Sequence, residues 1–223
     1  MVRLIDDAVG ELAGDVLDSE LFPFMLEPDA VATVAPVLRE ESLMVAKVVA
    51  SLSPVATVVG IGDAAQTYRN LAADIGANYV CVDPCIRPDR SILRRSDKPA
   101  AAALFFGKAY DKLDSRELPH GNVAWVFHFN LFPYLASASD TMSKMCIDGD
   151  VVLIGTWGRS DRSRELKRQY DNTVARLSFR TAELMERRRV VVTLPRLGRY
   201  RIIKGDLVDL HVLSVNQRNA EVA

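Results

Sequence analysis

A strand, glycine loop, helix and strand in succession constrain the fold of this chain more than any other segment. The pattern consists of an apolar run, a glycine pair, a helical stretch, a second apolar run and an acid: Ala56–Val59, Gly60-Ile61-Gly62, Gln66–Ile75, Tyr79–Val82 and Asp83. Glycine permits a sharp turn and a close approach of the backbone to a ligand. An acid about 20 residues further on can accept hydrogen bonds from both hydroxyls of a ribose. The segment therefore predicts a βαβ unit that binds an adenosine-containing cofactor.

The residues of the loop distinguish between possible cofactors. A dinucleotide fingerprint has a third small residue three positions after the second glycine, and Ala65 satisfies that requirement, so the spacing alone does not exclude NAD. Asp63, however, stands at the turn, where a carboxylate would repel a pyrophosphate. An acidic turn favours a cofactor that carries a cationic amine and a sulfonium.

With this loop and with Asp83 at the end of the second strand, the sequence resembles the class I S-adenosylmethionine (SAM)-dependent methyltransferases. One departure is that Val58 and Val59 stand where the family often has an acid before the loop. The resemblance covers residues 55–215 and implies SAM as the cofactor. It implies cofactor contacts from the glycine loop, the ribose-binding acid and the backbone of the loop after the third strand: Gly60, Gly62, Asp63, Asp83, Ala109 and Tyr110.

The order of the remaining elements predicts an α/β fold, a Rossmann-like, doubly wound, mostly parallel seven-stranded sheet with an antiparallel strand at its edge. The five further strand candidates are 101–108, 122–129, 151–155, 190–194 and 207–215. Apolar positions recur at helical spacing over 4–17 and 28–52, and 137–145 and 165–188 are also expected to be helical. We expect residues 1–52 to form an N-terminal helical cover, or lid, over a Rossmann-like domain of residues 53–223, because about 50 residues rarely bury enough surface alone.

The end of the fourth strand carries the richest set of candidate catalytic groups. Ligands of an open α/β sheet bind outside the carboxyl ends of its strands. Asn130 offers one acceptor and two donors, which suits the orientation of an amine nucleophile. Aromatic side chains can surround a sulfonium, and here they are Trp125, Phe129 and Tyr134. We expect Asn130, Tyr134 and Trp125 at the transferring centre and Phe129 beside the cofactor; His128 is a possible base or a packing residue.

Composition and charge restrict the classes of molecule that we expect this chain to bind. The net charge is −1, with ten acids against three bases in residues 1–50 and fourteen bases against five acids in residues 159–204. Three cysteines make no disulfide framework, and no zinc site is expected. The acidic N-terminus and the lack of an 18-residue apolar run indicate a cytoplasmic chain without a membrane segment. We expect a small-molecule substrate, no nucleic acid, and a monomer or homodimer.

Three activities remain open at this stage. The leading one is SAM-dependent modification of a small molecule in biosynthesis, at an amine nitrogen. The second is a cyclase resembling azetidine-2-carboxylate synthases, in which the cofactor's own amine attacks its γ-carbon and expels methylthioadenosine. The third is methylation of RNA adenine, because Asn130-Leu-Phe-Pro-Tyr134 resembles the Asn-Leu-Pro-Tyr motif of ribosomal RNA methyltransferases with one residue inserted.

Overall fold

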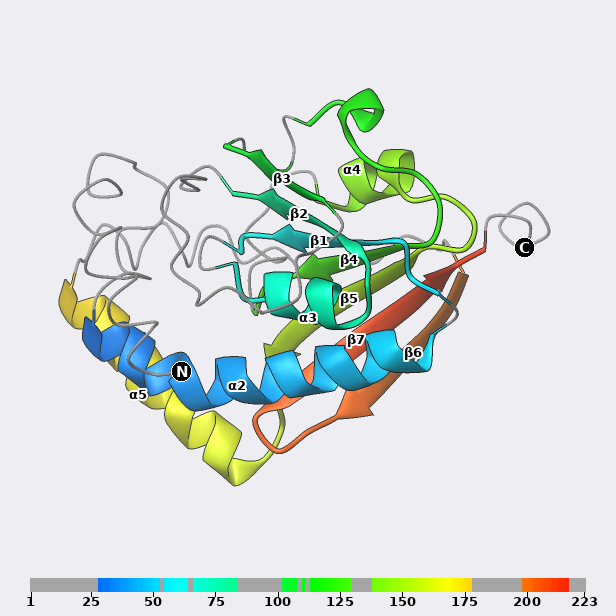
Figure 1. Ribbon diagram of the computed structural model, residues 1–223. Helices are drawn as coiled ribbons and strands as arrows, with labels where there is room; N and C mark the ends of the chain where they lie inside the picture. The colour runs from blue at the N-terminus through cyan, green and yellow to red at the C-terminus, as the bar shows by residue number, and fades with distance from the viewer. Residues whose placement is uncertain are drawn as a thin grey trace.

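Strands and helices alternate along the chain in the computed structural model (Figure 1). The structure describes residues 28–52, 54–63, 66–83, 102–107, 110, 113–129, 138–177 and 198–216. The strands are β1 (Thr57–Ile61), β2 (Asn78–Val82), β3 (Ala103–Phe106), β4 (Val123–Phe127), β5 (Val151–Trp157), β6 (Gly198–Lys204) and β7 (Val208–Val215). The helices are α2 (Pro28–Ser51), α3 (Arg69–Asp74), the short 3-10 helix η3 (Ser115–Glu117), α4 (Ala138–Met145) and α5 (Asp161–Leu177).

The seven strands form one sheet in the order β3-β2-β1-β4-β5-β7-β6. The first five pair in parallel, and β7 runs antiparallel to both β5 and β6. Every residue of the central strands β1 and β4 is buried. Burial on both faces explains why these strands read as continuous apolar runs rather than as alternating ones. The predicted doubly wound, mostly parallel seven-stranded sheet is confirmed.

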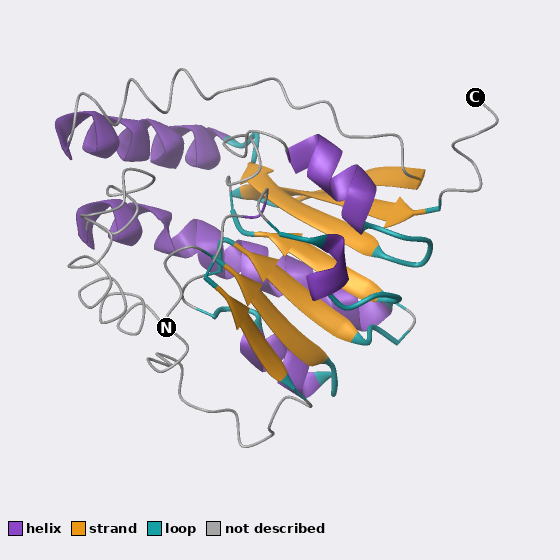
Figure 2. Ribbon diagram, turned by 90° about the horizontal axis from the view of Figure 1, so that it is seen from above, coloured by secondary structure: helices purple, strands orange, loops and turns teal. Residues whose placement is uncertain are grey.

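Helices cover both faces of the sheet (Figure 2). On one face, Val45, Val48 and Val49 of α2 join Ala72 of α3 in a hydrophobic cluster with the strands. On the other face, α4 contributes to a second cluster with residues of β4 and β5. The predicted helix over 28–52 is confirmed, and its C-terminal half shares a core with the sheet. None of the helices that the structure describes combines the length and apolar character needed to cross a membrane.

The first half of α2 continues past the carboxyl ends of the parallel strands and lies beside α5 (Figures 1 and 2). A hydrophobic cluster of Val37, Phe129, Leu207 and Val208 joins this part of α2 to the sheet. The predicted cover therefore has one element in the described part of the chain. The predicted helix over 4–17 lies outside the described residues, so the division at residue 52 stays a prediction.

The sixth strand spans different residues from those that the sequence predicted. We expected 190–194 to be the strand and 195–206 the connection, but β6 spans Gly198–Lys204 within that connection. β6 is an edge strand whose first four residues are exposed, so Arg199, Tyr200 and Arg201 occupy it without an apolar pattern. The antiparallel strand is β7, which lies one position inside the edge. Residues 190–194 lie outside the described part.

Two helices begin at residues that the periodicity did not predict. α5 begins at Asp161 rather than at residue 165, because the Ser160 hydroxyl accepts a hydrogen bond from the Ser163 amide at 2.9 Å and caps the helix. α3 begins at Arg69 rather than at residue 66. The residues just before it form a turn whose amides are bound by the side chain of Asp63.

At the amino end of the sheet, one buried carboxylate joins three segments. Asp150 is 2% exposed and accepts hydrogen bonds from the amides of Val123 and Ile147, at 3.0 and 3.1 Å, and from the indole Nε1 of Trp125 at 3.0 Å. Hydrogen bonds to a charged acceptor are among the strongest that a protein forms. Asp150 thus fixes the starts of β4 and β5 relative to one another.

We expect Asp150→Ala to lower the free energy of unfolding by about 3 kcal/mol, because it leaves two buried donors and one part-buried donor without this acceptor. Urea unfolding at neutral pH, followed by tryptophan fluorescence and far-UV circular dichroism, measures this change. Asp148→Ala, at an exposed position of the same turn, is the matched control and should cost far less. Equal losses in both variants would show that the turn, and not the buried carboxylate, matters.

Candidate functional site

The carboxyl ends of the five parallel strands lie at one edge of the sheet (Figure 1). This edge brings together segments that are far apart in the sequence. They are the glycine loop after β1, Asp83 after β2, Gly107 after β3, the His128-Phe129 pair after β4 and Trp157 at the end of β5. Ligands of open α/β sheets bind at such an edge, so the candidate site lies here.

The two glycines of the loop are needed for different reasons. Gly62 has a φ of 72°, which L-amino acids with a side chain rarely adopt. Its amide donates to the carbonyl of Val82 at 2.8 Å, which fixes the loop beside the end of β2. A Cβ at Gly60 would lie 2.8 Å from the Cβ of Asp63 and 2.9 Å from its Oδ2. Gly60 is therefore required to leave room for the side chain of Asp63.

Asp63 points into the protein, and the prediction that its carboxylate faces the cofactor is wrong. The residue is fully buried. Oδ1 accepts a hydrogen bond from the amide of Thr67 at 2.6 Å, and Oδ2 accepts from the amide of Tyr68 at 3.0 Å and the hydroxyl of Tyr79 at 2.7 Å. Burial raises the pKa of Asp63 above its ordinary value, although the hydrogen bonds from Tyr68, Tyr79 and Thr67 oppose this rise. Asp63 joins the loop to α3 and β2, and its charge is not directed at a ligand.

Asp83 lies at the end of β2, as expected from the sequence. The residue is 9% exposed, and its amide donates to the carbonyl of Phe106 at 3.1 Å, so the backbone there is held by β3. Its place beside the Gly62 amide contact with Val82 brings the acid and the glycine loop together. That Asp83 binds a ribose stays a prediction.

Trp125 does not lie at the site, which corrects its predicted catalytic role. Its side chain is 1% exposed in the core, and its indole turns toward Asp150 at the amino end of the sheet. The sequence placed it near the strand end, but it occupies the middle of β4. Contact with a transferring centre is excluded by this position.

The other predicted aromatic residues are buried beneath the edge. The Phe129 ring is 5% exposed and packs edge-on against Trp157, with ring centroids 5.0 Å apart. Tyr110 is 2% exposed, its ring packs edge-on against Phe127, and its hydroxyl has no hydrogen-bond partner. Cofactor contacts by Phe129 and by the backbone at Tyr110 stay predictions. Ala109, Asn130 and Tyr134 lie outside the described residues.

A buried carboxyl group on α2 was missed at the sequence level. Glu41 is fully buried, and its Oε2 accepts hydrogen bonds from the hydroxyl of Tyr68 at 3.0 Å and from the amide of Phe129 at 3.2 Å. Its Oε1 has no hydrogen-bond partner among the described residues, and a Cβ at Gly155 would overlap it. The available signal was its spacing, four residues after Val37 and four before Val45. A charged residue inside an apolar helical stripe indicates a specific partner.

The protonation states in this cluster follow from burial. Desolvation raises the pKa of Glu41 to about 8, an effect that the nearby charge of Asp63 reinforces and the two hydrogen bonds oppose. Desolvation likewise lowers the pKa of His128. The His128 Nδ1 lies 4.0 Å from Glu41 Oε2, but both groups are neutral at pH 7, so the contact is not an ion pair. The side chain of His128 is 13% exposed, and its ring centroid lies 5.8 Å from that of Tyr68.

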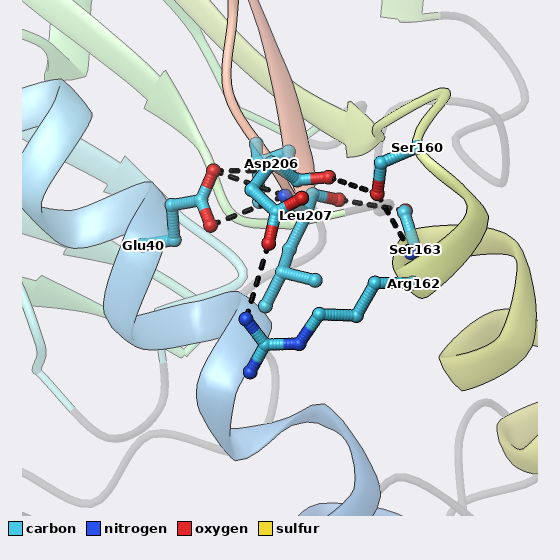
Figure 3. A network of polar contacts seen from close by, with 7 residues as sticks. Glu40, Ser160, Arg162, Ser163, Asp206 and Leu207 are labelled. Atoms are coloured by element: carbon cyan, nitrogen blue, oxygen red, sulfur yellow. Dashed lines mark hydrogen bonds and ion pairs between the residues drawn. The ribbon is translucent and has the colours of Figure 1, made fainter.

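A second anchor of α2 lies at the turn between β6 and β7 (Figure 3). Both oxygens of the Glu40 carboxylate accept from the amide of Leu207, at 3.0 and 3.1 Å. The beginning of α5 meets the same turn, where Ser163 Oγ donates to the carbonyl of Leu207 at 2.9 Å and Arg162 pairs with Asp206 at 3.1 Å. Neighbouring glutamates thus attach α2 to two different parts of the carboxyl edge.

Comparison with known proteins supports the fold. No protein-family profile and no curated protein matches the sequence. Among solved structures, the plantazolicin methyltransferase BpumL in complex with SAH is 10% identical, with a TM-score of 0.54 over 96% of this chain and 98% of that chain. Human N-acetylserotonin methyltransferase in complex with SAM is 14% identical, with a TM-score of 0.55 over 95% of this chain and 65% of that chain. The chain has the fold of class I SAM-dependent methyltransferases.

The raised pKa of Glu41 makes the stability of the protein depend on pH. A group with a raised folded-state pKa contributes stability that is fully present below its unfolded value, near 4.5, and is lost as the pH rises through about 8. We expect Glu41→Gln to remove this loss, because the amide does not titrate. The difference in unfolding free energy, variant minus wild type, should therefore increase between pH 6 and pH 8.5 by about 2.5 kcal/mol, at about 1.4 kcal/mol per pH unit up to the folded-state pKa.

Urea unfolding of both proteins at half-unit steps of pH measures this difference. Asp63 and His128 titrate in both proteins, so their contributions cancel to first order in the comparison. Parallel stability curves for the two proteins would contradict the raised pKa of Glu41.

Proposed function

We propose that this protein is a SAM-dependent methyltransferase that transfers a methyl group to an amine nitrogen of a small molecule. The observation that carries the proposal is the arrangement at the carboxyl edge. There the positive-φ Gly62 is hydrogen-bonded to the end of β2 immediately before Asp83. Two structural neighbours with TM-scores above 0.5 are methyltransferases whose structures hold SAH or SAM.

The residues present fit an adenosine-containing cofactor. The loop presents backbone without side chains at Gly60 and Gly62, and Asp83 supplies a carboxylate, which accepts hydrogen bonds but donates none when ionised. Beside β3, a Cβ at Gly107 would meet no atom of the described residues within 4 Å. Asp83 would hold the ribose, and the backbone at Ala109 and Tyr110 would border the adenine. The bound cofactor supplies a methyl group already activated by the sulfonium.

Methyl transfer from a sulfonium requires little covalent catalysis by the protein. The protein contributes the orientation of the reactants and the exclusion of water. In this proposal Asn130 and Tyr134, which follow β4, orient the acceptor amine. No base among the described residues is required at the transferring centre, because a neutral amine attacks directly. α2 and α5, which lie beyond the strand ends, would exclude water from the acceptor side.

Incubation of the purified protein with SAM, with and without candidate amines, tests the proposal by mass spectrometry of the products. Formation of SAH only when an amine is present supports it. Methylthioadenosine with a four-carbon imino acid, formed from SAM alone, would establish the cyclase instead. Methylation of RNA but of no small amine would also overturn the proposal.

Replacement of Asp83 by alanine should weaken binding of SAH by about 1.5–3 kcal/mol, because hydrogen bonds to a charged group are lost. Isothermal titration calorimetry on folded protein measures the change. Asp74→Ala, at an exposed position at the end of α3, is the control and should bind as the wild type does. Unchanged affinity in the Asp83 variant would remove this residue from the ribose site.

Asn130→Ala should lower turnover by about 100-fold, or about 2.7 kcal/mol, while the affinity for SAH changes little. An interaction used mainly in the transition state has this signature. Single-turnover rates and melting temperatures are to be measured on the same preparation. If the variant loses stability but keeps its rate per folded molecule, Asn130 is a helix cap rather than a catalytic residue.

A further inference from the structure

One carboxyl group on α2, which we call the cover helix, contacts two segments of the candidate site. The hydroxyl of Tyr68 and the amide of Phe129 converge on a single oxygen of Glu41, at 3.0 and 3.2 Å. Tyr68 stands at the end of the turn that follows the glycine loop, and its own amide is bound by Asp63. Phe129 immediately precedes Asn130 and begins the segment after β4. These two segments are 61 residues apart in the sequence, and α2 joins them.

We propose that Glu41 is a positioning residue, which fixes the cofactor loop and the segment after β4 relative to one another by accepting hydrogen bonds from both. This inference rests on the proposed function, because the loop is assigned to the cofactor and the segment to the acceptor. Glu41 itself is fully buried, and in this proposal it contacts neither the cofactor nor the acceptor. It acts through Tyr68 and Phe129.

Packing alone does not explain a glutamate at this place. Burial of a carboxyl group is unfavourable unless its hydrogen bonds offset the cost, and one oxygen of Glu41 has no hydrogen-bond partner in the part of the chain that the structure describes. β5 also lacks a side chain at Gly155, where a Cβ would overlap the carboxyl group. An apolar residue of similar size would fill the volume at less cost. The hydrogen bonds to Tyr68 and Phe129 are what such a residue could not supply.

The surroundings accommodate the neutral form of the carboxyl group. The titratable groups that face it are Tyr68 before α3, Asp63 in the glycine loop and His128 after β4. Asp63 repels a second negative charge, and His128 is held neutral by burial. Because Oε2 accepts both hydrogen bonds, the proton belongs on Oε1. A glutamine can reproduce this arrangement, with its carbonyl as the acceptor and its amide group in the place of Oε1.

The matched pair Glu41→Gln and Glu41→Met separates positioning from packing. The two side chains have similar size, but only glutamine accepts hydrogen bonds. At pH 7 we expect Glu41→Gln to retain kcat within about 3-fold of the wild type and Glu41→Met to lower kcat by about 10–100-fold. In the absence of ligand, Glu41→Met should exchange amide hydrogens faster at both 66–68 and 127–129.

Glu40→Met is the control for Glu41→Met, because it removes the acceptor with which Glu40 anchors the same helix to the turn before β7 and not to the site (Figure 3). It should lower the melting temperature without faster exchange at 66–68 and 127–129 and without loss of kcat per folded molecule. Equal kcat and equal exchange in the methionine and glutamine variants would overturn the proposal. Faster exchange in only one of the two segments, or an equal effect of Glu40→Met, would overturn it as well.

Failure of the proposed function is visible separately, because wild-type protein would then neither bind SAH nor consume SAM. The exchange comparison needs no ligand and still decides whether Glu41 holds the two segments together. Joint loss of protection at both segments supports the structural part, and its absence overturns it.

Discussion

The carboxylate of Asp63 is the interaction on which the candidate site depends. Three donors from the beginning of α3 and from β2 bind it, and the absence of a side chain at Gly60 leaves room for it. These contacts join the end of β1 to β2 and to the turn before α3. The position of Gly62, which presents backbone without a side chain, therefore depends on a buried acid.

The cover helix repeats this arrangement on a larger scale. Its consecutive glutamates accept backbone amides from two places that lie far apart in the sequence, Leu207 before β7 and Phe129 after β4. In both cases a side chain of α2 accepts a hydrogen bond from a backbone amide that lies just outside a strand. α2 is attached to the edge by directed hydrogen bonds as well as by the apolar contacts of Val45, Val48 and Val49. Directed hydrogen bonds fix the position of α2 along the sheet more sharply than apolar contacts alone would.

The sequence predicted a strand well where both of its faces are buried, and poorly where the strand is exposed. β1 and β4 are buried on both faces and read as apolar runs, and α2 shows a regular stripe. β6 is exposed along most of its length, so its residues carry no such pattern. The sequence correctly predicted that Gly62 and Asp83 follow the ends of β1 and β2, and their binding of a cofactor stays a prediction. The direction of the Asp63 side chain could not be predicted, because it depends on Tyr79 in the neighbouring strand and on the space at Gly60.

The contact between Glu40 and Leu207 has a consequence for the order in which this protein can be completed on the ribosome. The two residues are 167 positions apart, and β7 follows directly after Leu207. During synthesis the glycine loop and its βαβ unit emerge early and can pair locally. The helix that precedes them meets this partner only after Leu207 has emerged. A nascent chain truncated before residue 207 would thus have the loop without this anchor of its cover.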